Sequence, residues 1–169
     1  PGGEIFTSLQ TGVIDATEWV GPYNDLTFGL HQAAKYYYYP GWQEPGPTLE
    51  FIINKKSLDP LPDDLKEIIR VAARAVNEDV LAEYTARNHL ALRELVNTHH
   101  VQLRRLPDDV IAELYDISEK VIAEIPGDDP LAQRIYKSYI EYRDSIIVYH
   151  DISERSYFNA RAAQIENHK

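Results

Sequence analysis

Residues 61–97 read LPDDLKEIIRVAARAVNEDVLAEYTARNHLALRELVN. Pro62 stands in what would be a first helical turn, where a proline loses no intrahelical hydrogen bond, and the two aspartates after it favour the positive end of a helix dipole. Apolar residues then recur at helical spacing. This apolar stripe consists of Ile68, Ile69, Ala72, Ala73, Val76, Val80, Tyr84, Leu92, Leu95 and Val96. The pattern predicts one long helix from about Pro62 to Asn97.

The same Leu-Pro-Asp-Asp motif recurs at 106–109 and predicts a second helix from Pro107 to Glu124, closed by Ile-Pro-Gly at 125–127. Asp129 before Pro130 is typical of an N-cap followed by a proline at the first helical position. No helix breaker follows, so a third helix of about 35 residues and roughly 50 Å is expected. We expect so long a helix to form a core seam that braces two lobes, or to contact another subunit. Its apolar face would comprise Ile135, Tyr139, Tyr142, Ile146, Tyr149, Tyr157 and Phe158.

The chain changes character near residue 56. Before it, the short apolar runs 13–14 and 48–53 lie between Gly and Pro turns and are typical of strands mixed with short helices. The sequence therefore indicates a helix-rich α/β chain in three portions. These are an α/β portion at 1–56, a helical portion at 57–128 and a very long C-terminal helix at 129–169.

Composition excludes several classes of function. A net charge of −10 argues against a nucleic-acid groove, which needs clustered Lys and Arg. There is no cysteine, which excludes disulfides, thiolate metal sites and cysteine nucleophiles. The chain begins at Pro1 and contains no methionine, so we expect a fragment or a processed product.

Two glutamates stand out, each in a turn-rich segment that also holds a tryptophan. Glu18 precedes Trp19 within DATEWVGP (15–22), and Glu44 lies within PGWQEPGP (40–47). As a pair they would suit a glycosidase-like enzyme, with one acid and one nucleophile or base. As hard oxygen ligands they would suit a cation such as Na⁺ or Ca²⁺. Each glutamate also fits an exposed or salt-bridged loop position, and the long helices alone would fit a helical oligomerisation module.

Two further clusters are read as structural. The tyrosines at 36–39, just before Pro40, favour a buried strand or helix end with hydroxyls at its rim. His99 and His100 follow the first long helix, but adjacent residues point in different directions and no carboxylate cluster accompanies them. We therefore interpret them as surface or helix-terminal histidines rather than as metal ligands.

Several of these segments together resemble the extracytoplasmic solute-binding subunit of tripartite ATP-independent periplasmic (TRAP) transporters, the DctP-like family, and within it the branch that binds 2-oxo acids. The resemblance covers most of the chain and is carried by the combination rather than by any single piece. The matching pieces are EIFTSLQTG (4–12), IDA (14–16), EW (18–19), YYYYPGW (36–42), EPG (44–46), DPL (129–131), ISER (152–155) and NAR (159–161).

The resemblance implies the C-terminal half of a two-lobed, type II-like periplasmic binding protein that catalyses nothing. In that branch a cation bridges the protein and the substrate carboxylate. The matching positions are Glu18 and Glu44 as side-chain ligands, and Trp19 as a backbone carbonyl ligand that lines the substrate pocket. Because two carboxylates facing an anion would repel it, a bound cation would reverse the local sign.

The implied ligand is a small 2-oxo or hydroxy monocarboxylate, with pyruvate the leading candidate. The implied cofactor is Na⁺ or Ca²⁺, and the implied partners are the TRAP membrane subunits. A second copy as partner is suggested separately, by the length and apolar face of the C-terminal helix. The implied location is the periplasm. The substrate-clamping arginine and the shared glutamine of the family align upstream of residue 1, and Gln10 does not match that glutamine.

Overall fold

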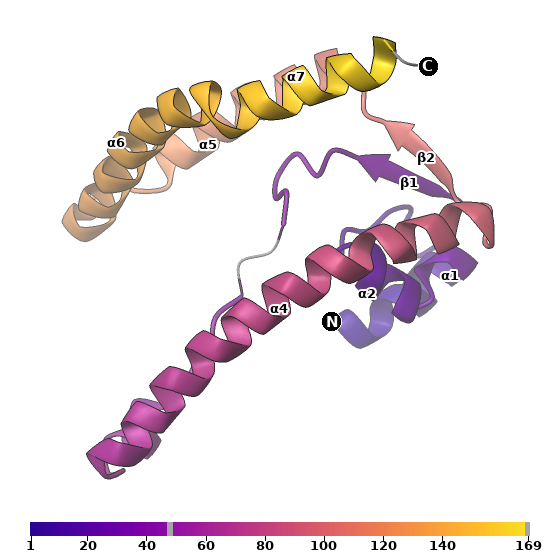
Figure 1. Ribbon diagram of the computed structural model, residues 1–169. Helices are drawn as coiled ribbons and strands as arrows, with labels where there is room; N and C mark the ends of the chain where they lie inside the picture. The colour runs from indigo at the N-terminus through magenta and orange to yellow at the C-terminus, as the bar shows by residue number, and fades with distance from the viewer. Residues whose placement is uncertain (47–48, 168–169) are drawn as a thin grey trace. The chain divides into compact units, whose positions relative to one another are not determined.

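The longest element is α4, which runs from Asp63 to Asn97 and confirms the first predicted helix (Figure 1). The structure is a computed structural model and describes residues 1–46 and 49–167. Two units are distinguished, Pro1–Ile111 and Ala112–Lys169, and each is described by itself. The remaining elements are η1 (Gly2–Glu4), α1 (Ile5–Thr11), α2 (Pro22–Thr27), η2 (Leu30–Gln32), β1 (Tyr36–Tyr39), α3 (Lys55–Leu58), β2 (Gln102–Arg105), α5 (Asp108–Glu124), α6 (Pro130–Ile152) and α7 (Glu154–Asn167).

In the first unit, α2 packs against the carboxyl half of α4. The Asn88 side chain accepts a hydrogen bond from the Tyr23 backbone N–H at 3.0 Å, which satisfies one of the free N–H groups at the start of α2. The Tyr23 ring meets Tyr84 edge-on at 6.0 Å and lies 5.2 Å below the Arg87 guanidinium. This end of α4 therefore fixes α2 through both polar and aromatic contacts.

The core of the first unit lies at the same end of α4. Leu95 is only 2% exposed and is the largest fully buried side chain among the described residues. The other buried apolar residues that the structure describes are Leu9, Leu30, Ala91 and Val101. By contrast, the amino-terminal half of α4 leaves Leu65, Ile68, Val71 and Val76 exposed.

β1 and β2 form a parallel pair, with Tyr36 opposite Gln102 and Tyr39 opposite Arg105 (Figure 1). β2 lies between the two long helices α4 and α5 in the chain and runs from Gln102 to Arg105. Flanking hydrogen bonds continue the pairing, because Gln102 N–H donates to Lys35 and Leu106 N–H donates to Tyr39. The helix-rich α/β class is thereby confirmed, since the described residues combine one parallel strand pair with many helices.

Two expectations about the first unit are wrong. The run 49–53 forms no strand, and Leu49, Phe51 and Ile52 are exposed, because this segment has no neighbouring strand to pair with; Thr48 lies outside the described residues. The tyrosine run forms a strand, but it is not buried as a whole. Only Tyr37 is turned inward, while Tyr36, Tyr38 and Tyr39 are each about half exposed.

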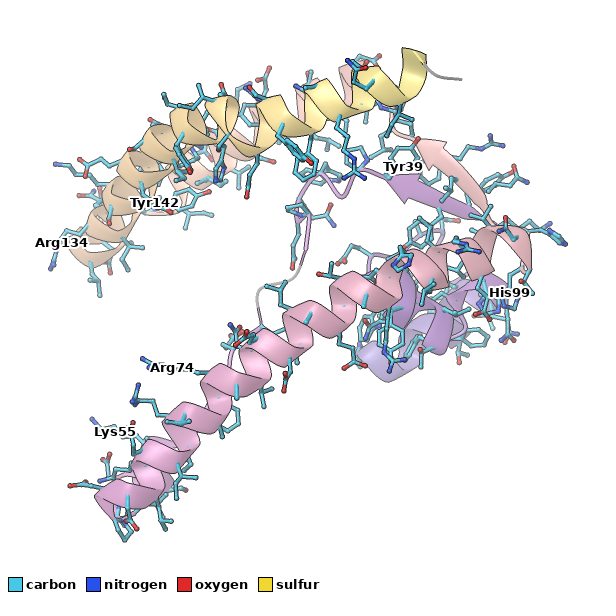
Figure 2. All side chains as sticks on the ribbon, in the orientation of Figure 1. Tyr39, Lys55, Arg74, His99, Arg134 and Tyr142 are labelled. Carbon is cyan, nitrogen blue, oxygen red and sulfur yellow. The ribbon has the colours of Figure 1, made fainter. Side chains whose placement is uncertain are left out.

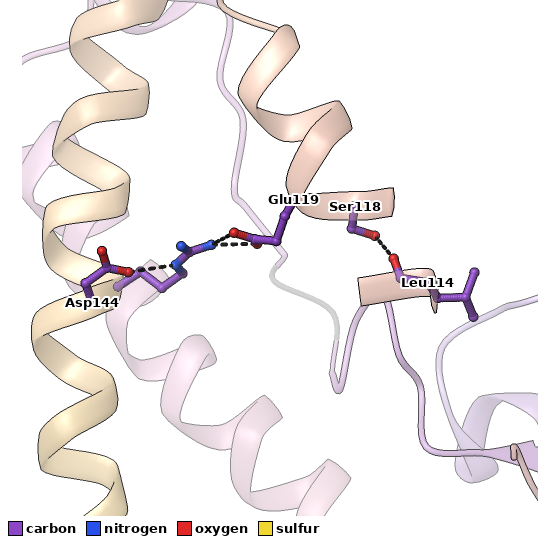
Figure 3. A network of polar contacts seen from close by, with 5 residues as sticks. Leu114, Ser118, Glu119 and Asp144 are labelled. Atoms are coloured by element: carbon purple, nitrogen blue, oxygen red, sulfur yellow. Dashed lines mark hydrogen bonds and ion pairs between the residues drawn. The ribbon is translucent and has the colours of Figure 1, made fainter. Parts of the chain in front are cut away.

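In the second unit, Arg143 of α6 bridges two helices. Its guanidinium donates to both carboxylate oxygens of Glu119 on α5 at 2.6 and 2.8 Å, and to Asp144 at 3.2 Å (Figure 3). The hydrogen bond to Glu119 is the main cause that raises the pKa of Arg143 above its ordinary value. The ion pair links α5 to α6 within this unit.

The helical C-terminal segment begins as predicted but is interrupted. Asp129 caps α6, because its carboxylate accepts from the Leu131 and Ala132 N–H groups at 2.7 and 2.9 Å. At Ser153 the backbone leaves the helical region, with φ −107° and ψ −102°, and the chain resumes as α7. The predicted single helix over 129–169 is thus two helices, with residues 168–169 outside the described part. None of the helices within the described residues has the length and apolar character required to cross a membrane.

Candidate cation site

Glu18 lies in the loop between α1 and α2. The loop begins where Gly12 adopts a left-handed conformation at φ 74°, and its N–H donates back to Leu9 at 3.2 Å. The loop ends at Pro22, where Asn88 holds the start of α2. Because both ends are fixed to the first unit, the exposed Glu18 side chain is carried by a short, anchored segment.

Trp19 anchors the middle of that loop. Its ring stacks on Phe28 with centroids 5.1 Å apart and planes 25° apart. The same ring lies against η1, where a Cβ added to Gly2 would stand 3.1 Å from its edge. The indole is thus packed into the unit, and the ligand role expected for Trp19 concerns its backbone carbonyl.

Glu44 lies in the turn that follows β1, beyond Tyr39 (Figure 2). The turn is tight, because a Cβ added to Gly41 would lie only 2.7 Å from the backbone carbonyl oxygen of Glu44. Real Cβ atoms do not approach an oxygen that closely, so glycine is required here. The exposed Glu44 side chain is therefore presented by a turn whose backbone folds closely on itself.

Glu44 lies near enough to Glu18 to oppose its ionisation. The pKa of Glu18 is raised, first by loss of hydration and then by the negative charges of Glu44 and Asp25. Two carboxylates that repel each other form a place where a cation would relieve the repulsion. Within the described ranges, no three His, Asp or Glu side chains converge on one metal position.

A buried carboxylate that sequence reasoning missed lies beside these glutamates. Asp25 of α2 is 7% exposed, and its Oδ2 accepts a short hydrogen bond from the Tyr37 hydroxyl of β1. Burial raises the pKa of Asp25, while the Tyr37 hydroxyl and the N–H groups of Val20 and Gly21 act in the opposite direction. Burial, together with the Asp25 carboxylate, also raises the pKa of Tyr37.

No sequence signal distinguished this pair. Asp25 reads as an acidic residue in a first helical turn, which is normally exposed, and Tyr37 is one of four consecutive tyrosines. Only the placement of α2 beside β1 brings the two together.

The histidine that follows α4 has a partner from the small 3₁₀ helix η2. His99 lies just past the carboxyl end of α4 (Figure 2), its ring 4.0 Å from that of His31 and its Nε2 3.6 Å from Glu94. This agrees with a helix-terminal role for His99. His31, Asp25 and Tyr37 also line a cavity of about 30 Å³ at the edge of the core.

The donor set fits a hard cation. Glu18 and Glu44 offer carboxylate oxygens and Trp19 a carbonyl oxygen, which are the ligand types that Na⁺ and Ca²⁺ prefer. Ca²⁺ takes about six to eight oxygens, so these residues would fill part of the shell and leave positions for other oxygens.

Comparison with known families identifies the class of protein as a solute-binding protein. The model of the bacterial extracellular solute-binding proteins, family 7 (DctP), matches residues 1–127, and the chain belongs to this family. That assignment confirms the predicted family and, at the level of the family, its location outside the cytoplasm.

Comparison with individual proteins shows which members of the family this chain is similar to. The chain is 37% identical over 159 residues to a monocarboxylate 2-oxoacid-binding periplasmic protein of Nostoc sp., covering 94% of this chain and 43% of the relative. It is 36% identical to a TRAP periplasmic solute-binding protein of Colwellia psychrerythraea that was solved with calcium and pyruvate. This match has a TM-score of 0.86 and covers 94% of this chain and 48% of that protein.

A TRAP transporter solute-binding protein of Bordetella bronchiseptica is similarly close. It was solved as a mixed-occupancy dimer with calcium and picolinate in one site, and it matches with a TM-score of 0.91 and 30% identity over 100% of this chain and 50% of its own. The chain thus spans about half the length of these relatives.

Proposed function

We propose that this chain forms part of a periplasmic receptor that captures a small 2-oxo monocarboxylate such as pyruvate, together with Na⁺ or Ca²⁺, and delivers it to TRAP membrane subunits. The observation that carries the proposal is that Glu18 and Glu44 are exposed on two loops of the first unit, and that the charge of Glu44, after loss of hydration, contributes to the raised pKa of Glu18. The ligands in the relatives' names support a carboxylate of this size.

In this proposal Glu18, Trp19 and Glu44 hold the cation and thereby contribute to substrate binding. The cation neutralises the two carboxylates and attracts the carboxylate of the substrate. The ring of Trp19, which stacks on Phe28, keeps the loop in place while its backbone carbonyl serves the cation. The role of the chain's own residues is to hold and orient the cation.

We infer further that the protein catalyses no reaction. A glycosidase would need one carboxyl kept protonated near neutral pH beside a second, ionised one, both flanking a substrate cleft. Glu18 and Glu44 are both exposed in the first unit. The pKa of Glu18 is raised first by loss of hydration and then by the like charges of Glu44 and Asp25, and a cation would cancel only the effect of those charges.

A titration of pyruvate followed by tryptophan fluorescence tests the function, with Na⁺ and Ca²⁺ present or absent. It is carried out on a protein of the relatives' full length that contains this chain. The two tryptophans of this chain are Trp19, next to Glu18, and Trp42, in the same turn as Glu44. Saturable, cation-dependent quenching of their fluorescence is therefore expected. A complete lack of response to 2-oxo and hydroxy acids would refute the ligand assignment.

The variant Glu44→Gln links that response to the site. It removes one charged ligand, so cation and pyruvate affinity are expected to fall together while the melting temperature of the cation-free protein changes little. Glu50→Gln is the matched control, because Glu50 is also exposed and lies shortly after the same turn. Equal effects of both substitutions would contradict the assignment.

We also propose that a second copy of the protein packs along α6. Leu131, Ile135, Tyr139 and Tyr142 are between 51% and 68% exposed and follow one another along this helix; Figure 2 shows Tyr142 on α6. Exposed apolar surface of this kind marks an interaction site. The dimeric state of the Bordetella relative supports a second copy as the occupant.

A further inference from the structure

We propose that Asp25 and Tyr37 position the two glutamates for the cation, with the buried Asp25 carboxylate adding negative charge behind them. This inference rests on the proposed function and deepens it, because it assigns two residues outside the expected ligand set. Neither residue is proposed to touch the cation.

The connection follows from where the two residues stand in the chain. Asp25 lies on α2, the helix that begins as the Glu18 loop ends. Tyr37 lies on β1, the strand from which the Glu44 turn emerges. The hydrogen bond from the Tyr37 hydroxyl to Asp25 Oδ2 therefore ties the two segments that carry the glutamates to each other.

A purely structural role explains Asp25 poorly. A buried carboxylate is costly unless it is paired and fully hydrogen-bonded. Among the described residues no lysine or arginine forms an ion pair with Asp25, and its Oδ1 has no hydrogen-bond partner. An asparagine would accept the same Tyr37 hydrogen bond without burying a charge.

The charge of Asp25 has a use if a cation binds nearby. Asp25 lies on the helix that follows the Glu18 loop and is hydrogen-bonded to the strand that precedes the Glu44 turn, so its charge would attract a cation held between Glu18 and Glu44. The other titratable neighbour is His31, whose Nδ1 is buried and without a partner and which faces the same cavity as Asp25. The third carboxylate thus strengthens the site without occupying a ligand position.

The test compares Asp25→Asn and Tyr37→Phe with wild type in the full-length form, by calorimetric titration with CaCl₂ alone and by thermal melting without cation. Asp25→Asn is expected to raise the Ca²⁺ dissociation constant about tenfold, the lower end for residues that orient metal ligands, while the cation-free melting temperature stays the same or rises. Tyr37→Phe is expected to weaken Ca²⁺ binding and also to lower the melting temperature, since it leaves Asp25 Oδ2 unpaired.

Two matched controls test whether the effect depends on these two positions or on the loss of any carboxylate or tyrosine hydroxyl. Asp79→Asn removes one charge from an exposed site on α4, and Tyr38→Phe removes a hydroxyl from the exposed neighbour of Tyr37. Neither control is expected to change Ca²⁺ binding. Wild-type affinity in Asp25→Asn would overturn the inference, and so would a fall in its cation-free melting temperature, because that would make Asp25 a stabilising residue.

The outcomes also distinguish this inference from the proposed function. If wild type binds Ca²⁺ and pyruvate but Asp25→Asn binds Ca²⁺ equally well, the receptor function stands and the role of Asp25 is refuted. If wild type binds no cation at all, both fail together.

Discussion

Replacing Gly41 by alanine would test directly whether the turn after β1 sets the position of Glu44. The added Cβ would stand 2.7 Å from the Glu44 carbonyl oxygen, whereas ordinary contacts begin at 3.4 Å. The obstructing atom is backbone, so it cannot rotate away as a flexible side chain would. Either the turn opens or Glu44 moves.

The size of the effect follows from that overlap. Relieving it requires a displacement of about 0.7 Å, the shortfall from an ordinary contact, whereas metal sites hold their ligand distances to within about 0.2 Å. We therefore expect Gly41→Ala to raise the Ca²⁺ dissociation constant at least about tenfold, or about 1.4 kcal/mol. The melting temperature should change little, because Gly41 is exposed and lies outside the core.

Calorimetric titration with CaCl₂ and thermal melting of the full-length form measure both quantities. Gly46→Ala is the control, since it lies in the same segment and a Cβ added there meets nothing within 4 Å. Wild-type Ca²⁺ affinity in Gly41→Ala would refute the reasoning, because Glu44 would then not bind the cation from this turn. Equal losses in both variants would show that the segment tolerates no substitution, for reasons unrelated to the contact.

Two further predictions concern pH and assembly. Burial, aided by His99 and opposed by Glu94, lowers the pKa of His31. The unfolded chain therefore binds more protons at this histidine than the folded protein does. The contribution of neutral His31 to the free energy of unfolding is thus fully present above about pH 6.5 and is lost as the pH falls below that value. Melting temperatures from pH 7 to pH 5 should therefore fall less in His31→Gln than in wild type, and parallel curves would contradict this. For the α6 surface, Tyr142→Glu should convert a wild-type dimer into a monomer in light scattering, whereas a monomeric wild type would refute the dimer proposal.

The helices were predictable because their signals are local. Pro and Asp in the first turn, followed by an apolar period, predicted α4 and α5 to within a residue at their starts. The interruption at Ser153 was not predictable, because serine is a tolerated helix residue and the break depends on the backbone conformation there. Strand prediction failed at 49–53 for a related reason, since a strand requires a partner that no local pattern supplies.

The candidate site, like the fold, could be predicted only in part. Glu18, Trp19 and Glu44 were proposed from residue type, turn context and resemblance. Their proximity was not, because it depends on how the Glu18 loop and the Glu44 turn are held by the first unit. Asp25 and Tyr37 were missed entirely, since their significance lies in one hydrogen bond between α2 and β1.

The arrangement also explains why cation and substrate should bind as a linked pair. In a chain of net charge −10, Glu18, Glu44 and Asp25 together would exclude an anion from this edge of the first unit. In the proposed receptor, a cation held by two carboxylates and one carbonyl would reverse that field and leave oxygen positions that a 2-oxo acid could fill. Because linkage is reciprocal, any factor by which the cation raises substrate affinity is the factor by which the substrate raises cation affinity. The buried charge of Asp25 would then contribute to substrate capture only through the cation, without any contact with the substrate itself.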